Sequence, residues 1–280
     1  MAVDGVSYHV ERREPSGPPP GAGRVPVVLL HGFTGSASTW EGLAAALAGA
    51  GRAAIAVDLI GHGLSDAPRA PSRYAIERVA DDLVALLSQL GHPRARWLGY
   101  SMGGRVALVL AARHPRSVDA LLLEGATAGL SDPGERSERA RADDALAARI
   151  ERGGVPAFVE EWEGLPLWDS QRSLPPEVRE RLRQQRLQND AGGLARALRG
   201  MSVGRQPSLW EELGPLSMPA LLLAGSLDGK FTTIAREMAR ALPNATMEPI
   251  GGAGHAAHLE RPGAFAEAVL RFLDGADAAD

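Results

Sequence analysis

Three residues whose side chains cooperate in proton transfer, Ser101, Asp228 and His255, each stand in a short glycine-containing stretch. Ser101 is the centre of a G-x-S-x-G pattern, the run 99–103. A serine hydroxyl becomes a base or nucleophile only when a neighbour takes its proton; histidine does this near neutral pH, and a carboxylate then orients and stabilises the imidazole. The order Ser, Asp, His is one that accompanies a nucleophile elbow. The sequence therefore predicts Ser101, Asp228 and His255 as a catalytic triad.

The elements around these residues predict how they are positioned. The run that ends at Tyr100 is typical of a buried strand, and an apolar helix begins directly after Ser101. Asp228 follows a predicted strand over 219–225, and His255 follows another over 245–250. Because ligands of α/β sheets bind at the carboxyl ends of the strands, all three side chains are expected at one sheet edge.

A further apolar run, residues 25–30, is broken by His31-Gly32-Phe33. Such a turn after a central strand leaves backbone N–H groups at the same sheet edge. The N–H groups of Phe33 and Met102 are therefore predicted as an oxyanion hole, a pair of donors for developing negative charge. His31 is interpreted as a residue that shapes the turn.

Other titratable residues compete for these roles. Glu124 also follows a predicted strand and is an alternative to Asp228, although it lacks the flanking turn residues. His258 can face the same cavity, but a packing or capping role is favoured. The loop from Asp58 to Ser65 contains His62 and several glycines, and a structural role is favoured for it.

Between the fifth predicted strand (118–123) and the strand 219–225, the chain becomes charged, arginine-rich and helical in its periodicity. An insertion at this point would lie across the sheet edge and cover Ser101, so it is interpreted as a lid. The remaining elements are strands over 6–12 and 53–57, a loop over 15–23 and helices over 40–50 and 76–90. The helices predicted in the insertion cover 135–152, 155–162, 176–188 and 193–201.

Composition limits the classes of function. The chain has 280 residues, a formal net charge of -4 and no cysteine. An acidic balance argues against nucleic acid as a partner, and scattered histidines without cysteine argue against a metal site. No apolar run is long enough for a membrane span, and the first residues lack the layout of a signal peptide, so a cytoplasmic protein without a cofactor is expected. A monomer and a homo-oligomer both remain open.

Taken together, these motifs resemble the α/β-hydrolase superfamily, and finer features resemble its MenH-like members, the 2-succinyl-6-hydroxy-2,4-cyclohexadiene-1-carboxylate synthases of menaquinone biosynthesis. The resemblance implies a mostly parallel central sheet flanked by helices, with a helical lid inserted after the sixth strand. It divides the chain into core residues 1–126, lid residues 127–210 and core residues 211–280. The motifs that carry it are Leu30-His31-Gly32-Phe33, Asp58-x-x-Gly61-His62-Gly63-x-Ser65, Tyr100-Ser101-Met102-Gly103-Gly104-Arg105, Arg139-x-x-x-Asp143, Trp162 with Leu165-Pro166-Leu167, Arg186-x-x-Asn189, Arg199-Gly200-Met201, Gln206-Pro207-x-Leu209-Trp210, Asp228-x-Lys230-Phe231 and Gly254-His255-x-x-His258-Leu259-Glu260.

The same resemblance implies a lyase that removes a carbon-bound proton and eliminates pyruvate from a small polycarboxylate substrate. Guanidinium groups suit such a substrate because they are planar, always charged and bidentate towards carboxylates. The substrate-binding residues that it implies are Tyr100, Arg105, Arg139, Trp162 and Arg186. Two alternatives stay open: a hydrolase of a carboxylic ester or a carbon–carbon bond, and a non-catalytic ligand-binding module on the same fold.

Overall fold

A seven-stranded sheet forms the centre of the molecule, in a computed structural model that describes residues 1–16 and 25–278. Its strand order is β3-β5-β4-β6-β7-β8-β9, and every neighbouring pair is parallel except β3 with β5. The predicted loop over 15–23 lies largely outside the described residues. The strands are β3 (Val10–Arg13), β4 (Val27–Leu30), β5 (Ala54–Val57), β6 (Ala95–Tyr100), β7 (Val118–Glu124), β8 (Ala220–Gly225) and β9 (Ala245–Ile250).

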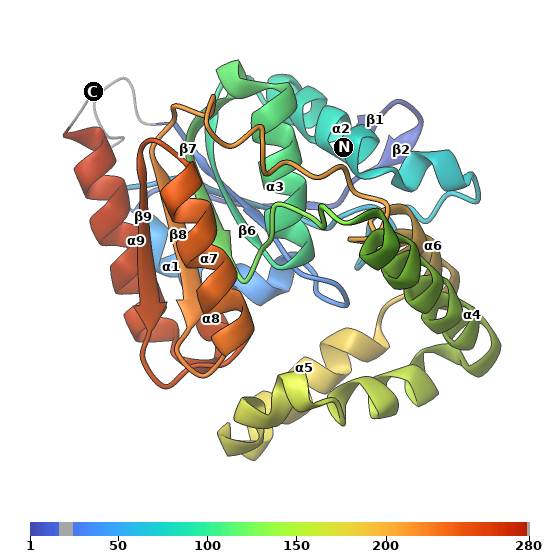
Figure 1. Cartoon of the computed structure of the whole chain (residues 1–280). Coiled ribbons are helices and arrows are strands. Elements are labelled where there is room, and N and C mark those ends of the chain that lie inside the picture. Colours follow the sequence, from blue (N-terminus) through green and yellow to red (C-terminus); the bar gives the residue numbers. More distant parts are fainter. Residues whose placement is uncertain (17–24, 279–280) are drawn as a thin grey trace.

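Helices cover both faces of this sheet (Figure 1). α2 (Ile76–Gln89), α3 (Met102–Arg113) and α7 (Gly229–Ala241) pack on one face, and α1 (Glu41–Gly49) and α9 (Pro262–Asp277) pack on the other. Because neighbouring side chains of a strand point to opposite faces, Trp97 of β6 is buried with the first group and Leu98 with the second. Burial on both faces explains why β4 and β8 are apolar runs rather than alternating ones.

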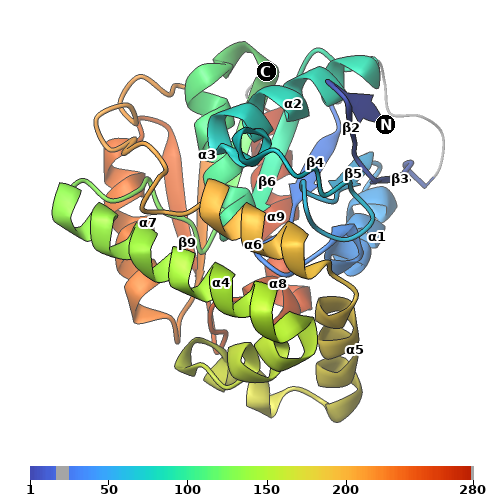
Figure 2. The same cartoon turned by 90° about the vertical axis from the view of Figure 1, so that its right-hand side faces the viewer.

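The chain between β7 and β8 forms a separate layer of helices, α4 (Pro133–Glu163), α5 (Pro176–Leu187) and α6 (Ala191–Gly200), with the 3₁₀ helix η4 (Pro166–Ser173) between α4 and α5. α4 and α6 lie side by side in Figure 2. The sequence predicts two helices where the structure has α4, and the predicted break coincides with a kink at Gly154, whose φ is 75°. Glycine adopts this left-handed conformation without strain.

Two details differ from the sequence-based expectation. The single strand expected over 6–12 is two short strands: β2 (Val6–Ser7) pairs with β1 (Ala2–Val3), whereas β3 joins the main sheet. The segment between β2 and β3 is held by the Tyr8 N–H, which donates to Met1 O. The resemblance implies that the helical layer follows a sixth strand. In the structure it follows β7, which is the fifth strand of the main sheet along the chain, since β1 and β2 pair only with each other and do not belong to that sheet.

The short helices complete the chain: η1 (Ala37–Trp40), η2 (Pro71–Tyr74), η3 (Pro115–Ser117) and α8 (Ala257–Glu260). In the described part of the chain, no helix combines the length and hydrophobicity needed to cross a bilayer.

Candidate active site

Ser101 lies in a tight turn between β6 and α3. Its φ is 51°, a left-handed conformation that non-glycine residues seldom adopt, and its N–H donates to Glu124 O at 2.7 Å. The turn brings α3 so close to β4 that a Cβ atom on Gly103 would collide with the carbonyl oxygen of Leu30. This is the geometry of a nucleophile elbow, and it presents the serine hydroxyl at the carboxyl edge of the sheet.

Ser101, His255 and Asp228 come together although they are far apart in the sequence. His255 Nε2 lies 3.1 Å from Ser101 Oγ, and His255 Nδ1 lies 2.8 Å from Asp228 Oδ2. Asp228 caps the N-terminus of α7 in the turn that follows β8, and its other carboxylate oxygen accepts a hydrogen bond from the Phe231 N–H at 3.1 Å. The structure thus brings the three predicted residues into one hydrogen-bonded chain.

Electrostatics keep the acid of this chain ionised. Burial alone raises the pKa of the Asp228 carboxyl, but the hydrogen bonds from His255 and from the Phe231 N–H, together with nearby positive charge, bring the pKa below its usual value. Asp228 is therefore a carboxylate at neutral pH. A carboxylate in this position stabilises the imidazolium that forms when His255 takes a proton.

The loop that carries His255 is held by Glu260 of α8. The Glu260 carboxylate accepts hydrogen bonds from the Gly254 N–H at 2.6 Å and from the Ala256 N–H at 3.4 Å, one on each side of His255. The side chain of His255 also packs against the ring of Phe231, with the centroids 4.6 Å apart. In the sequence Glu260 stands only as the last residue of the motif that contains His255, with no predicted role of its own.

Glu124, the alternative acid, has a different partner. Its carboxylate accepts from the His258 N–H at 3.1 Å, and Glu124 Oε2 lies 2.7 Å from His258 Nδ1. Both side chains are buried, and the His258 ring packs against Trp40 and Tyr100 with centroid distances of 4.5 and 4.7 Å. Asp228, not Glu124, is therefore the carboxylate next to His255.

The two predicted oxyanion donors also lie at this edge. Phe33 follows β4 and Met102 begins α3, and neither backbone N–H has an acceptor among the described residues. Free N–H groups that flank a nucleophile can stabilise negative charge on a substrate.

The histidines and the aspartate of the neighbouring turns hold the backbone. His31 Nε2 accepts a hydrogen bond from the Leu59 N–H at 3.0 Å. Asp58 accepts from the N–H groups of Ala37 and Leu64 at 2.5 and 2.7 Å. His62 is fully buried, and burial lowers its pKa to about 3, with the nearby His31 acting in the same direction. These contacts agree with the structural roles favoured for the two loops.

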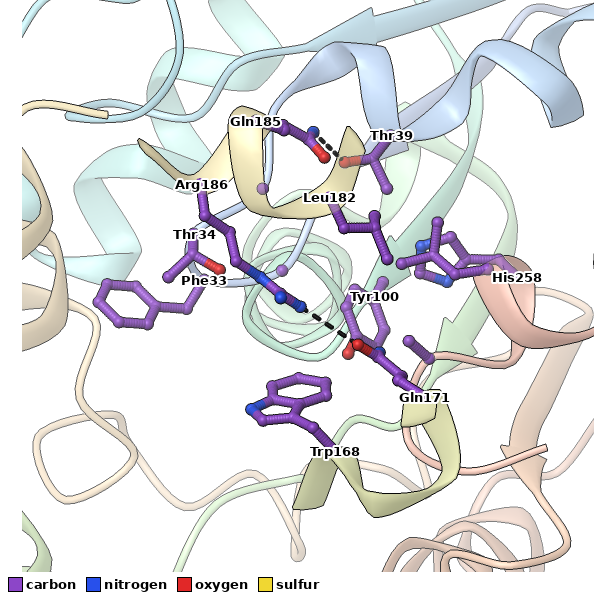
Figure 3. A pocket seen from close by; sticks show the side chains of 14 residues that line it. Phe33, Thr34, Thr39, Tyr100, Trp168, Gln171, Leu182, Gln185, Arg186 and His258 are labelled. Atoms are coloured by element: carbon purple, nitrogen blue, oxygen red, sulfur yellow. Dashed lines mark hydrogen bonds between the residues drawn. The ribbon is translucent and has the colours of Figure 1, made fainter. Parts of the chain in front are cut away.

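A small pocket of about 30 Å³ lies beside the elbow (Figure 3). Tyr100 and Arg186 line it, and Arg186 donates to Gln171 Oε1 at 3.3 Å. Arg186 also pairs with Glu163 at 2.8 Å and lies over the ring of Trp168. Trp162 packs behind this group, with its ring centroid 5.6 Å from that of Trp168.

Arg105 of α3 and Arg139 of α4 have partners other than those of Arg186. Arg105 donates to Met201 O at 2.7 Å and to Gln206 Oε1 at 3.0 Å, whereas Arg139 donates to Asp143 at 2.9 Å. Burial and the positive charge of Arg139, opposed by Asp143, together lower the pKa of Arg105 to about 10. These two arginines therefore form a second basic group, and the structure gives them protein partners that differ from those of Arg186.

Some residues of the pocket were missed by the sequence analysis. Trp168 and Gln171 reach it from η4, and Gln185 of α5 donates to Ser36 Oγ and Thr39 Oγ1 at 2.8 and 2.6 Å. A short 3₁₀ helix has no apolar periodicity that would reveal its inward side. Within residues 1–16 and 25–278, no group of three or more acidic or histidine side chains is arranged to hold a metal ion.

Comparisons with known proteins agree with this geometry. Residues 25–262 match the α/β hydrolase fold family. The chain is 42% identical over 270 residues to a Bacillus subtilis (strain 168) protein provisionally named 2-succinyl-6-hydroxy-2,4-cyclohexadiene-1-carboxylate synthase, covering 96% of each chain. A Pectobacterium atrosepticum protein that bears the same synthase name is 34% identical over 248 residues, which is 88% of this chain and 93% of that protein.

Among solved structures, MenH from S. aureus superposes with a TM-score of 0.89 at 32% identity, covering 96% of this chain and 99% of the other. The chain therefore belongs to the α/β-hydrolase family and, within it, to the MenH-like group that these relatives represent. The predicted fold and the predicted resemblance are confirmed.

Proposed function

We propose that the protein is a lyase that eliminates pyruvate from 2-succinyl-5-enolpyruvyl-6-hydroxy-3-cyclohexene-1-carboxylate and leaves 2-succinyl-6-hydroxy-2,4-cyclohexadiene-1-carboxylate, a step of menaquinone biosynthesis. The observation that carries the proposal is the contact chain from Ser101 through His255 to Asp228 in a protein whose relatives bear this synthase name. The helical segment 127–210 serves as its lid.

In the proposed reaction Ser101 is the base for the carbon-bound proton. His255 accepts the hydroxyl proton as Ser101 Oγ takes the proton from the ring carbon, and the ionised Asp228 stabilises the imidazolium. The electron pair of the broken C–H bond forms a double bond to the neighbouring ring carbon. The existing ring double bond moves one position towards the ether carbon, and the C–O bond to the enolpyruvyl group breaks. The imidazolium returns its proton to the departing oxygen, and the enol rearranges to pyruvate.

Two further groups support this chemistry. The Phe33 and Met102 N–H groups stabilise the enolate-like charge that develops on the substrate carbonyl while the proton leaves. Tyr100 lines the pocket and Trp162 packs against Trp168 behind it, and both are assigned to substrate binding, while Arg105, Arg139 and Arg186 bind substrate carboxylates. Since Arg105 and Arg139 lie apart from Arg186, they are assigned to a different carboxylate of the same substrate.

A direct assay tests the proposal. The purified protein is incubated with the enolpyruvyl substrate, and pyruvate release is measured with lactate dehydrogenase while absorbance follows the conjugated diene. Equal amounts of both products are expected, and Ser101→Ala should abolish them. A neutral aryl ester, tested in parallel, distinguishes the alternative: rapid ester hydrolysis without pyruvate release would identify a hydrolase and refute the lyase.

A further inference from the structure

Two cavities of very different size share one wall in the helical layer. The inner one is the pocket of about 30 Å³ beside Tyr100. The outer one, which we call the lid groove, has a volume of about 470 Å³. The lid groove is lined by Glu163, Trp168, Gln171, Arg172, Pro176, Arg179, Glu180, Leu182, Arg183 and Arg186.

The common wall consists of four side chains, Trp168, Gln171, Leu182 and Arg186, which line both cavities. The Arg186 guanidinium lies 5.5 Å from the centroid of the Trp168 ring and is hydrogen-bonded to Gln171 across the wall (Figure 3). Arg186 therefore belongs to the inner pocket and to the lid groove at once.

The two cavities differ in the size of the ligand that they can hold. A cavity of about 30 Å³ has room for about one water molecule, whereas small-molecule sites usually occupy about 300–1,000 Å³. In this arrangement of the lid, the groove is therefore the cavity of the two that fits an organic ligand. A ligand in the groove would reach the inner pocket only if the side chains of the wall moved.

Charge indicates which ligand the groove fits. Four arginines and two glutamates line it. Glu163 pairs with both Arg183 and Arg186, at 2.7 and 2.8 Å. Among the described residues Arg179 has no carboxylate partner, and its side chain is exposed. The lining thus carries an excess of guanidinium, the group best suited to bind carboxylates.

We propose that the lid groove is a second binding site, in which Arg179 and Arg183 hold a carboxylate-bearing small molecule outside the wall that Arg186 and Trp168 form. The proposal rests on the proposed function for the identity of that molecule: either the polycarboxylate substrate before it passes the wall or pyruvate after it has left. Arg186 can release Gln171 and keep Glu163, so the wall can open without leaving the guanidinium unpaired.

A binding experiment tests the site without turnover. Ser101→Ala protein is titrated with succinate and, separately, with pyruvate, and binding is followed by NMR of the ligand at low ionic strength. Arg179→Gln should weaken the binding of at least one of them by about threefold or more, because it removes a charge-assisted contact. Arg181→Gln is the matched control, since Arg181 is an exposed arginine of the same helix that does not line the groove.

Each result has a defined meaning. Weaker binding of succinate alone assigns the groove to the incoming substrate, and weaker binding of pyruvate alone assigns it to the product. Loss of both supports a common passage. Equal effects of Arg179→Gln and Arg181→Gln, or no effect of either, would overturn the second site.

Kinetics separate this site from the reaction itself. In the active protein Arg179→Gln should raise KM about threefold to tenfold and leave kcat unchanged, and the difference should vanish at high ionic strength because exposed charges are screened. A protein that releases no pyruvate would refute the proposed function, whereas the NMR titration would still decide whether the groove binds carboxylates. A fall in kcat equal to the rise in KM would contradict a binding role outside the inner pocket.

Discussion

Glu124 and His258 form a buried contact of 2.7 Å directly behind the Ser101 turn, parallel to the contact of Asp228 with His255. Glu124 is the last residue of β7, and Asp228 follows the neighbouring strand β8. Only Asp228 reaches the histidine that contacts Ser101 Oγ. Glu124 instead joins the end of β7 to α8, because the His258 N–H donates to its carboxylate.

This arrangement predicts unequal effects for two isosteric substitutions. Asp228→Asn should reduce kcat by about 10³–10⁴-fold, because a neutral amide no longer orients the imidazole or stabilises its charge. Glu124→Gln should reduce kcat far less and instead lower the midpoint of urea unfolding, since it weakens a buried contact. Pyruvate release and urea unfolding are measured for both variants. An inactive Glu124→Gln protein beside an active Asp228→Asn protein would assign the acid to Glu124.

The positions of these residues show why much of the site was predictable from the sequence. Ser101, Asp228 and His255 each follow a strand that is predictable from the sequence. Parallel pairing then places their side chains at one edge whatever the rest of the chain does. The helices of the insertion were predictable from their helical periodicity. The kink at Gly154 falls where that periodicity breaks.

The pocket was less predictable because it depends on contacts between distant segments. Trp168 and Gln171 enter from η4, whose direction is set by packing of the helical layer on the sheet. The family resemblance implies that Arg105 and Arg186 bind the substrate, but it does not say which residues they contact. Only the structure shows that Arg105 is bound to Met201 O and Gln206, while Arg186 lies against Trp168.

Glu260 is predicted to position His255 without touching the substrate. In Glu260→Gln the side chain has one acceptor oxygen instead of two. One of the two N–H groups on either side of His255 therefore loses its hydrogen-bond acceptor. We expect kcat to fall about tenfold or more with little change in KM. A displaced His255 accepts the Ser101 proton less well, and this transfer occurs only in the transition state. Glu260→Asp should be no better, because its shorter side chain cannot span both N–H groups.

The control for Glu260 is Glu267→Gln, on the exposed side of α9, which should leave kcat unchanged. The pH profile gives an independent readout, because displacement of the histidine should shift its acidic limb. A Glu260→Gln protein with normal kcat and an unchanged pH profile would restrict Glu260 to a structural role.

Arg186 is predicted to distinguish the anionic substrate from a neutral one. Arg186→Gln should lower kcat/KM for the polycarboxylate by tens-fold to thousands-fold, which corresponds to about 2–5 kcal/mol for a buried charged contact. Glu163 keeps Arg183 as its partner at 2.7 Å, so the substitution leaves no buried charge unpaired. Hydrolysis of a neutral aryl ester, where detectable, should change little.

The same measurement on Arg105→Gln and Arg139→Gln tests the second basic group. Arg149→Gln serves as the control, because Arg149 pairs with Glu161 at 3.0 Å and both side chains are about half exposed. Equal losses on the polycarboxylate and the neutral ester would mean that the arginines support the fold of the lid rather than the substrate.

His62 predicts how the stability of the whole protein depends on pH. Its pKa is about 3 in the folded state, against 6.5 for an unperturbed histidine, because burial disfavours the charged ring. Between these values the unfolded chain binds a proton at this position that the folded chain does not. The free energy of unfolding therefore falls as the pH decreases below about 6.5, and the contribution of His62 to this loss is complete near pH 3.

The expected size is about 3 kcal/mol between pH 7 and pH 4 for His62 alone. Urea unfolding at a series of pH values measures it in the wild type, in His62→Gln and in His92→Gln. His92 lies in the turn after α2 and is only partly buried, so its substitution should leave the pH dependence unchanged. His62→Gln should lower stability at pH 7, because it disturbs the packing against His31 and Phe33, yet flatten the curve below pH 6.5. A curve for His62→Gln that stays as steep as that of the wild type would show that other groups cause the acid sensitivity.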